Sequence, residues 1–269
     1  MDTKPNRGTN FDPILFNAVN PITGMVVYPK GNIEILRTCL IQDKGHRPRR
    51  DKVRVFSKKS RERLALVAKE TDVEFKTFIT LTYGVNFPHS GKKVKTHLHR
   101  FLGLMKKHFG KFDYLWFFEF QRRGAPHLHM MTTLCKPDHW ERQTFASLWA
   151  IDVQGLEDWR YSRLKDRMRF MDQSNVIEFH LRPRQWEPLK SKEGAARYAT
   201  KYALKMHQKV PPPWFQDTGR FWGHSRKVGE FKGVKVKASE DTVRRLVKEV
   251  CPRIAGADVI PKYLYDCDF

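Results

Sequence analysis

Two apolar segments joined by a short turn place the strongest constraint on how this chain folds. Residues 113–121 read DYLWFFEFQ, which has the aromatic composition of a strand, and residues 127–134 read HLHMMTTL. The connection between them, residues 122–126, contains Gly124 and Pro126, which favour a turn. Because so short a connection joins only antiparallel neighbours, the sequence predicts a β-hairpin.

Further strands and helices are expected on both sides of this hairpin. Residues 75–83 (FKTFITLTY) and 176–181 are predicted strands, and residues 33–41 are a weaker candidate for an element. Apolar residues spaced three and four apart predict helices. These helices span residues 60–70, 92–109, 137–150, 191–207 and 240–250. The order of elements predicts an α+β fold, in which helices back a central antiparallel sheet.

The chain divides into three predicted segments. Residues 1–72 form a basic N-terminal extension with one helix, and residues 73–210 form the central domain. Residues 211–269 form a C-terminal extension that is expected to pack on the core. In the first segment, half of the positions from 44 to 63 are Lys or Arg, which is typical of a solvated or phosphate-binding arm.

The charge balance indicates a polyanionic partner. Lys and Arg total 51 against 29 Asp and Glu, which gives a net charge of +22, and 13% of the residues are aromatic. Basic and aromatic residues together are typical of nucleic-acid grooves, although charge can also simply keep a protein in solution. The candidate DNA-binding residues are Arg47, Arg49, Arg50, Lys52, Arg54, Lys58, Lys59, Arg122 and Arg123.

The cysteines and the N-terminus indicate a cytoplasmic protein. The 4 cysteines include no CxxC pair, which argues against a zinc ribbon or a disulfide framework and fits a reducing compartment. No apolar leader opens the chain, and no apolar run is long enough to span a bilayer. We therefore expect a protein that is neither exported by a standard signal nor inserted into a membrane.

The tripeptide His127-Leu128-His129 is a candidate metal site. Alternate residues of a strand share a face, so both imidazoles point the same way, and Glu119 or Gln121 on the preceding strand can join them. Such a mixed nitrogen and oxygen set suits Mn²⁺ or Mg²⁺. The alternative is a pair of half-buried histidines without a metal. The similar tripeptide at residues 97–99 lies in a helical pattern, where its histidines diverge by about 200° and cannot bind one ion.

A predicted helix carries two tyrosines four residues apart. Tyr198 and Tyr202 share one helix face, and Lys201 and Lys205 each follow a tyrosine by three positions. A phenol is a weak nucleophile at neutral pH, and a neighbouring cation helps it to attack a phosphodiester. The alternative is that both tyrosines simply pack against the sheet.

Together these motifs resemble those of the HUH endonuclease superfamily, and in particular its rolling-circle replication initiators. The strand 78–83 (FITLTY), the segment 126–130 (PHLHM) and the YxxK sequence from Tyr198 to Lys201 match three family motifs in order. Tyr202 completes a YxxxY pair, which is similar to the two-tyrosine initiators of bacterial phages and plasmids. The resemblance implies a ferredoxin- or RRM-like nuclease domain over residues 73–210.

The resemblance also implies a reaction. His127, His129 and Glu119, with Gln121 as the alternative, would hold Mn²⁺ or Mg²⁺ at the scissile phosphate. Tyr198 would nick single-stranded DNA at an origin hairpin, forming a 5′-phosphotyrosine and a free 3′-OH, and Tyr202 would perform the second strand transfer. Lys201 would orient the tyrosine or offset developing charge.

Other implied features concern partners and alternatives. The chain contains no Walker A motif, so a host helicase and polymerase would be required. Residues 219–225 (GRFWGHS) are similar to a segment found downstream in bacterial and phage members, without an assigned mechanism. A transposase or relaxase of the same superfamily, and a non-catalytic binder of single-stranded nucleic acid, are the competing hypotheses.

Overall fold

The computed structural model of the chain forms two compact units, which are described separately. The smaller contains the described residues up to 37 and those from Phe231 onward, and the larger contains those between. The described residues are 21–37, 55–153, 178–182, 185–204, 206–250 and 263–264.

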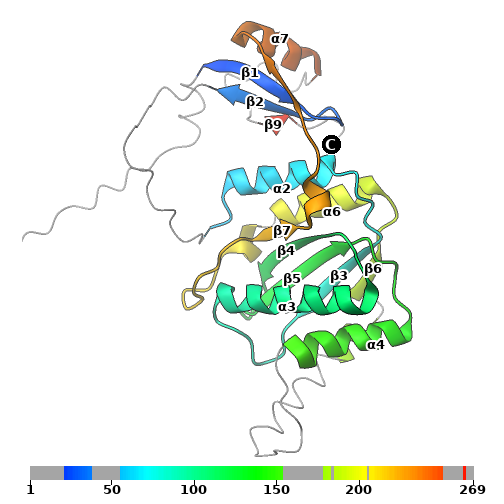
Figure 1. The fold of residues 1–269 in the computed structure, drawn as a ribbon. Coiled ribbons are helices and arrows are strands. Elements are labelled where there is room, and N and C mark those ends of the chain that lie inside the picture. The colour runs from blue at the N-terminus through cyan, green and yellow to red at the C-terminus, as the bar shows by residue number, and fades with distance from the viewer. Residues whose placement is uncertain are drawn as a thin grey trace, which may run out of the picture. The chain divides into compact units, whose positions relative to one another are not determined.

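The larger unit is built on a five-stranded sheet that is antiparallel throughout. Its strand order is β6-β3-β5-β4-β7, so the predicted hairpin provides two of the three inner strands. Helices lie on both faces, and the predicted α+β fold is confirmed (Figure 1). The strands are β3 (Thr77–Thr82), β4 (Tyr114–Phe120), β5 (Pro126–Thr132), β6 (Trp186–Pro188) and β7 (Trp222–His224).

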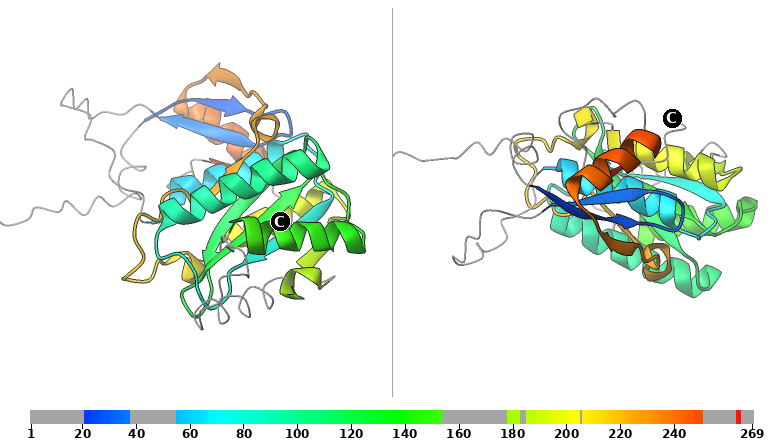
Figure 2. Two further views of the ribbon diagram at one scale, coloured as in Figure 1. Left: turned by 60° about the horizontal axis from the view of Figure 1, so that its bottom comes forward. Right: turned by 90° about the horizontal axis from the view of Figure 1, so that it is seen from above.

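The helices of the larger unit form two layers around this sheet. Helices α2 (Lys58–Glu70) and α6 (Lys192–Leu204) pack together on one face. Helices α3 (Gly91–Phe109) and α4 (His139–Ser147) lie on the other face, where both contact the π-helix η1 (Leu148–Val153) (Figures 1 and 2). Two short 3-10 helices, η3 (Met206–Lys209) and η4 (Arg226–Gly229), complete the unit.

Helix α3 shows why its sequence is helical. Its apolar residues recur every three or four positions, which places them on a single buried stripe. Phe101, at the centre of the stripe, meets Phe145 of α4 and Trp149 of η1 edge to face, at centroid distances of 4.8 Å and 5.3 Å. The stripe consists of Val94, Leu98, Phe101, Leu102 and Met105.

The strand predicted over residues 176–181 is wrong for the part that is described. Residues 178–181 are helical, and residues 176–177 lie outside the described ranges. The β6 strand pairs with β3 only as far as Ile79, so the backbone amide of Thr82 lies beyond that ladder. This amide instead donates to Nε2 of buried His180, at 3.2 Å. The helical turn thus places the His180 ring where a strand would have placed a carbonyl group.

Other predicted elements differ from the structure mainly at their ends. The helix expected over 137–150 is α-helical only to Ser147, and the π-helix η1 continues it. The helix expected over 191–207 ends at Leu204, and the candidate element 33–41 contains a strand that ends at Arg37.

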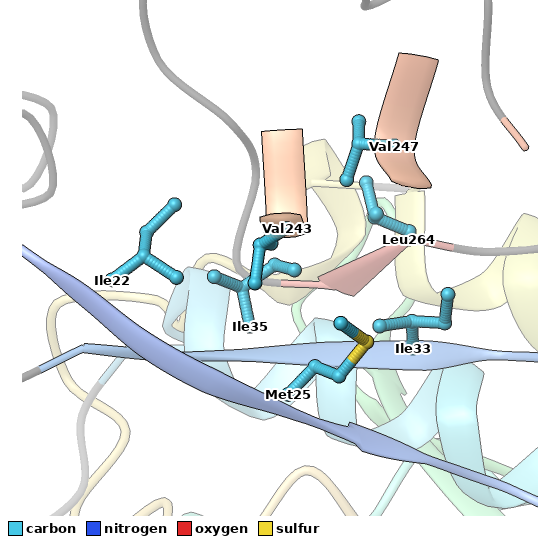
Figure 3. Close-up of a cluster of buried hydrophobic side chains, with 7 residues drawn as sticks. All are labelled: Ile22, Met25, Ile33, Ile35, Val243, Val247 and Leu264. Atoms are coloured by element: carbon cyan, nitrogen blue, oxygen red, sulfur yellow. The ribbon is translucent and has the colours of Figure 1, made fainter. Parts of the chain in front are cut away.

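The smaller unit is a four-stranded antiparallel sheet with one helix, and its strand order is β8-β1-β2-β9. Helix α7 (Glu240–Val250) packs on it through Val243 and Val247 (Figure 3). The core cluster contains Ile22, Met25, Ile33, Ile35, Val243, Val247 and Leu264. The strands are β1 (Ile22–Val27), β2 (Ile33–Arg37), β8 (Val234–Lys237) and β9 (Tyr263–Leu264).

This grouping differs from the three predicted segments of the chain. Helix α2 belongs with the five-stranded sheet rather than with the N-terminal extension. The described residues from 211 to Glu230 also belong to the larger unit, whereas α7 packs on strands from the N-terminal part of the chain.

No helix in the described part of the chain is both long enough and apolar enough to cross a membrane.

The core of the smaller unit gives a stability prediction. Ile35 is 2% exposed, so Ile35→Ala is expected to lower the free energy of unfolding of this unit by about 2–5 kcal/mol. Val236 on β8 is 40% exposed, and Val236→Ala should change it by about 0.5 kcal/mol or less. Hydrogen exchange of amides in β1, β2 and α7 measures both effects. Equal losses of protection in the two variants would contradict the assigned core.

Candidate functional site

Strand β5 lies between β3 and β4, and its register fixes the centre of the candidate site. His127 is opposite Glu119 on β4, and His129 is opposite Phe117 on β4 and Thr80 on β3. Because alternate residues share a face, both imidazoles lie on the same side of the sheet. Their ring centroids are 4.5 Å apart with perpendicular planes, at an interplanar angle of 88°.

Glu119 is a buried carboxylate held between two potential cations. Its Oε2 lies 3.4 Å from His129 Nε2, and its Oε1 lies 3.1 Å from Lys209 Nζ. Burial opposes ionisation of Glu119, but the hydrogen bond with His129 and the charge of Lys209 outweigh it and lower the carboxyl pKa. The site therefore contains a fixed negative charge at neutral pH.

The other ring nitrogens of the two histidines contact polar side chains. His129 Nδ1 lies 3.1 Å from Thr80 Oγ1, and His127 Nδ1 lies 3.2 Å from Gln121 Nε2. The Gln121 amide also donates to Thr82 Oγ1 at 2.9 Å. Contacts of this kind orient an imidazole so that its second nitrogen faces the site.

The donor chemistry of this cluster fits a divalent cation. Two imidazoles and one ionised carboxylate share a face, and the 3.4 Å between His129 Nε2 and Glu119 Oε2 is close to the separation of two ligands bound to one ion at about 2.1 Å each. Gln121 instead contacts the Nδ1 side of His127. Within the described ranges, however, no group of three or more His, Cys, Asp or Glu side chains is already arranged to hold a metal ion.

The two tyrosines of α6 meet this cluster on the same face of the sheet. The ring centroid of Tyr202 lies 4.5 Å from that of His129, and the ring stacks on Phe117 at 5.5 Å. Tyr198 stacks on Tyr202 at 6.1 Å and contacts Phe78 at 4.9 Å. The i, i+4 spacing thus carries a line of rings from the buried histidine outward.

The environments of the two phenols differ. Tyr202 is 7% exposed, and burial raises its pKa far above the ordinary value. Tyr198 is only half-buried, and its hydroxyl donates a short hydrogen bond to Glu187 of β6. This hydrogen bond, with burial, raises the pKa of Tyr198 to about 12. Tyr198 is therefore a neutral phenol that is already bonded to a potential proton acceptor.

Lys201 and the predicted DNA-binding residues have varied positions. Lys201 Nζ lies 5.7 Å from the Tyr198 ring centroid, and Lys58, Lys59 and Arg122 are exposed. Arg123 is held within the fold, since its guanidinium donates to the carbonyls of residues 83 and 84 and to the side chain of residue 121. Arg47, Arg49, Arg50, Lys52 and Arg54 lie outside the described residues.

The second histidine tripeptide, residues 97–99, lies on α3, as its helical pattern predicts. His97 Nδ1 contacts the hydroxyl of buried Tyr83 at 3.1 Å, whereas His99 is exposed. Burial, together with Lys93 and Arg100, lowers the pKa of His97 to about 4.

Three contributors to the site were missed in the sequence. Glu187 comes from a three-residue strand with no alternating pattern. Lys209 follows α6 as one of many lysines, and its burial at 3% exposure has no sequence signal. Thr80 lies in the predicted strand 75–83, and the period-two alternation from Phe78 to Thr82 could have placed it on the histidine face.

The described geometry defines an α+β domain in which an HxH strand faces a two-tyrosine helix. Residues 76–207, just under half of the chain, match a family model of replication-associated proteins, that of the ORF2 type. The matched segment contains both histidines, Glu119 and both tyrosines, and it links this domain to replication-associated proteins. No curated protein and no solved structure gave a match.

The buried ion pair gives a prediction for stability. Glu119→Gln leaves the Lys209 ammonium buried without its counter-charge, and is expected to cost about 3–5 kcal/mol of unfolding free energy. Adding Lys209→Met should recover much of this loss. Urea unfolding of the single and double variants measures the difference, and a double variant no more stable than Glu119→Gln would contradict the pairing.

The same carboxylate gives a pH prediction. Because folding lowers the pKa of Glu119, its contribution to stability is present above the unfolded pKa of about 4.3 and is lost as the pH falls through the lower folded pKa. The wild-type protein should therefore lose more stability on acidification across this range than Glu119→Gln. Equal pH slopes in urea unfolding would exclude a depressed pKa.

Proposed function

We propose that this protein initiates rolling-circle replication by nicking and rejoining single-stranded DNA at an origin. The observation that carries the proposal is the approach of the α6 tyrosines to the histidine strand, with the Tyr202 ring 4.5 Å from His129. The match of residues 76–207 to a replication-associated family supports the same role. A host helicase and polymerase would supply unwinding and extension.

His127, His129 and Glu119 are the residues that would hold Mn²⁺ or Mg²⁺. Such an ion, when bound, would polarise the scissile phosphate and offset its developing charge. Thr80 and Gln121 contact the opposite ring nitrogens and would keep both imidazoles directed into the site. Gln121 therefore suits an orienting role better than that of a ligand.

Tyr198 is the proposed first nucleophile. Its oxygen would form a bond to the scissile phosphorus while the bond from phosphorus to the 3′ oxygen breaks, which leaves a 5′-phosphotyrosine and a 3′-OH. The phenol proton would pass to Glu187, which already accepts the Tyr198 hydrogen bond, and the departing oxygen would take up a proton from water or a neighbouring acid. Lys201 lies near the ring and adds positive charge where the phosphate must approach.

Tyr202 is suited to a second strand transfer. Its ring is buried between Phe117 and Tyr198 and lies beside His129, so its phenol is deeper than that of Tyr198. In this arrangement the exposed tyrosine would cleave first, and the buried one would act after the first strand is attached.

The central test of the proposal is the covalent adduct. Wild-type protein with Mn²⁺ and single-stranded origin DNA should give an SDS-resistant adduct, which chelation abolishes and Mn²⁺ restores. The double variant Tyr198→Phe, Tyr202→Phe should give none, while Tyr114→Phe, which alters a half-buried tyrosine on β4, should react normally. An adduct in the double variant would falsify the assignment of the nucleophiles.

The proton acceptor has its own test. Glu187→Gln is expected to lower the single-turnover nicking rate by about 10²-fold, because general base catalysis typically contributes at least this much. Glu178→Gln, which removes a carboxylate that pairs with Arg182 on the surface, is the matched control and should leave the rate unchanged. Equal rates for the two variants would remove Glu187 from the mechanism.

A further inference from the structure

Three aromatic rings gather at a surface that the proposed reaction does not use. Phe87, His89 and Trp214, here called the ring platform, have centroid distances of 5.4 Å, 4.7 Å and 6.0 Å between their three pairs. Trp214 is 45% exposed, and neighbouring Val85 is 76% exposed. Large apolar side chains left in contact with water at one place commonly mark a binding surface.

The backbone holds the ring platform in place. The amide of Gln216 donates to the His89 carbonyl at 2.9 Å, and the amide of Gly91 donates to the Gln216 carbonyl at 2.8 Å. The turn between β4 and β5 supports the indole from another side. At Gly124 (φ +81°) a Cβ would lie 2.7 Å from Trp214 Cζ2. The rings are thus presented in a fixed position, which lowers the entropic cost of binding.

A chain of contacts connects the ring platform with the candidate site. The Arg123 guanidinium lies over the Phe87 ring at 5.2 Å, and its Nε donates to Gln121 Oε1 at 2.9 Å. Gln121 in turn lies 3.2 Å from His127 Nδ1. A ligand on the platform would therefore extend toward the histidine strand.

The surface beyond the ring platform is positively charged. Ser90, next to His89, lines a cavity of about 400 Å³ at the start of α3. Lys92, Lys93 and Arg100 line the same cavity, and none of its lining residues carries a carboxylate. Such a surface is complementary to a phosphate backbone.

We propose that the ring platform stacks an unpaired base of the single-stranded DNA that enters the candidate site, with adjoining phosphates on the basic cavity. Aromatic rings beside cationic side chains are the combination that single strands require, because bases stack and phosphates pair with charge. A duplex buries its base faces and offers none to the rings. This inference rests on the proposed function only in naming DNA as the strand.

The test compares a strand that has bases with one that has none. Fluorescence anisotropy, in EDTA to prevent cleavage, would measure binding of an oligothymidylate of about 16 nucleotides and of an abasic strand of equal length. Trp214→Ala is expected to weaken binding of the oligothymidylate about tenfold and to leave the abasic strand unchanged. Trp214→Phe should retain most of the affinity, which separates stacking from a folding defect.

Two further variants complete the experiment. Trp140→Ala removes another exposed tryptophan, which is 74% exposed on α4, and should bind both strands as the wild type does. The double variant Lys93→Ala, Arg100→Ala should weaken binding of both strands equally and reduce the salt dependence.

Wild-type affinity in Trp214→Ala, or an equal loss for both strands, would overturn the ring platform. This outcome is independent of cleavage. If the wild type binds through Trp214 but forms no covalent adduct with Mn²⁺, the proposed function fails and the ring platform stands.

Discussion

The pairing of β5 between β3 and β4 is the constraint on which the rest of the site depends. The register places His127 and His129 on one face and sets Thr80 and Glu119 on the flanking strands beside them. A shift of one residue would turn both imidazoles to the α3 side, where Leu128 and Met130 are now fully buried. The apolar residues of β5 that pack on that side therefore also determine where its histidines point.

Charge burial is the second organising feature. Glu119, His129 and Lys209 are each less than one-tenth exposed, and a charge in such a place is costly unless it is paired. The Lys209 ammonium also donates to the Phe118 carbonyl at 2.8 Å, which joins the end of η3 to β4. The electrostatic arrangement thus helps to fix the segment that follows the tyrosine helix.

The sequence predicted the elements with strong periodicity, and it failed where a tertiary contact decides. The hairpin, α3 and α7 follow from their apolar patterns, and the alternation in β5 indicated that the two histidines share a face. Strands β6 and β7 have 3 residues each, too few to show a pattern. The small sheet joins β1 to β8 across about 200 positions, and no local signal records such a pairing. At residues 178–181 the alternation was misleading, because His180 meets an edge amide that a single sequence does not reveal.

The most direct test of the account is whether both histidines bind one ion. Electron spin echo modulation of Mn²⁺ bound to the protein should show coupling to the nitrogens of two imidazoles, reduced to one in either His127→Ala or His129→Ala, and unchanged in His99→Ala, which alters an exposed histidine of α3. Bound Mn²⁺ without nitrogen coupling, or coupling that survives the loss of both histidines, would contradict the site described.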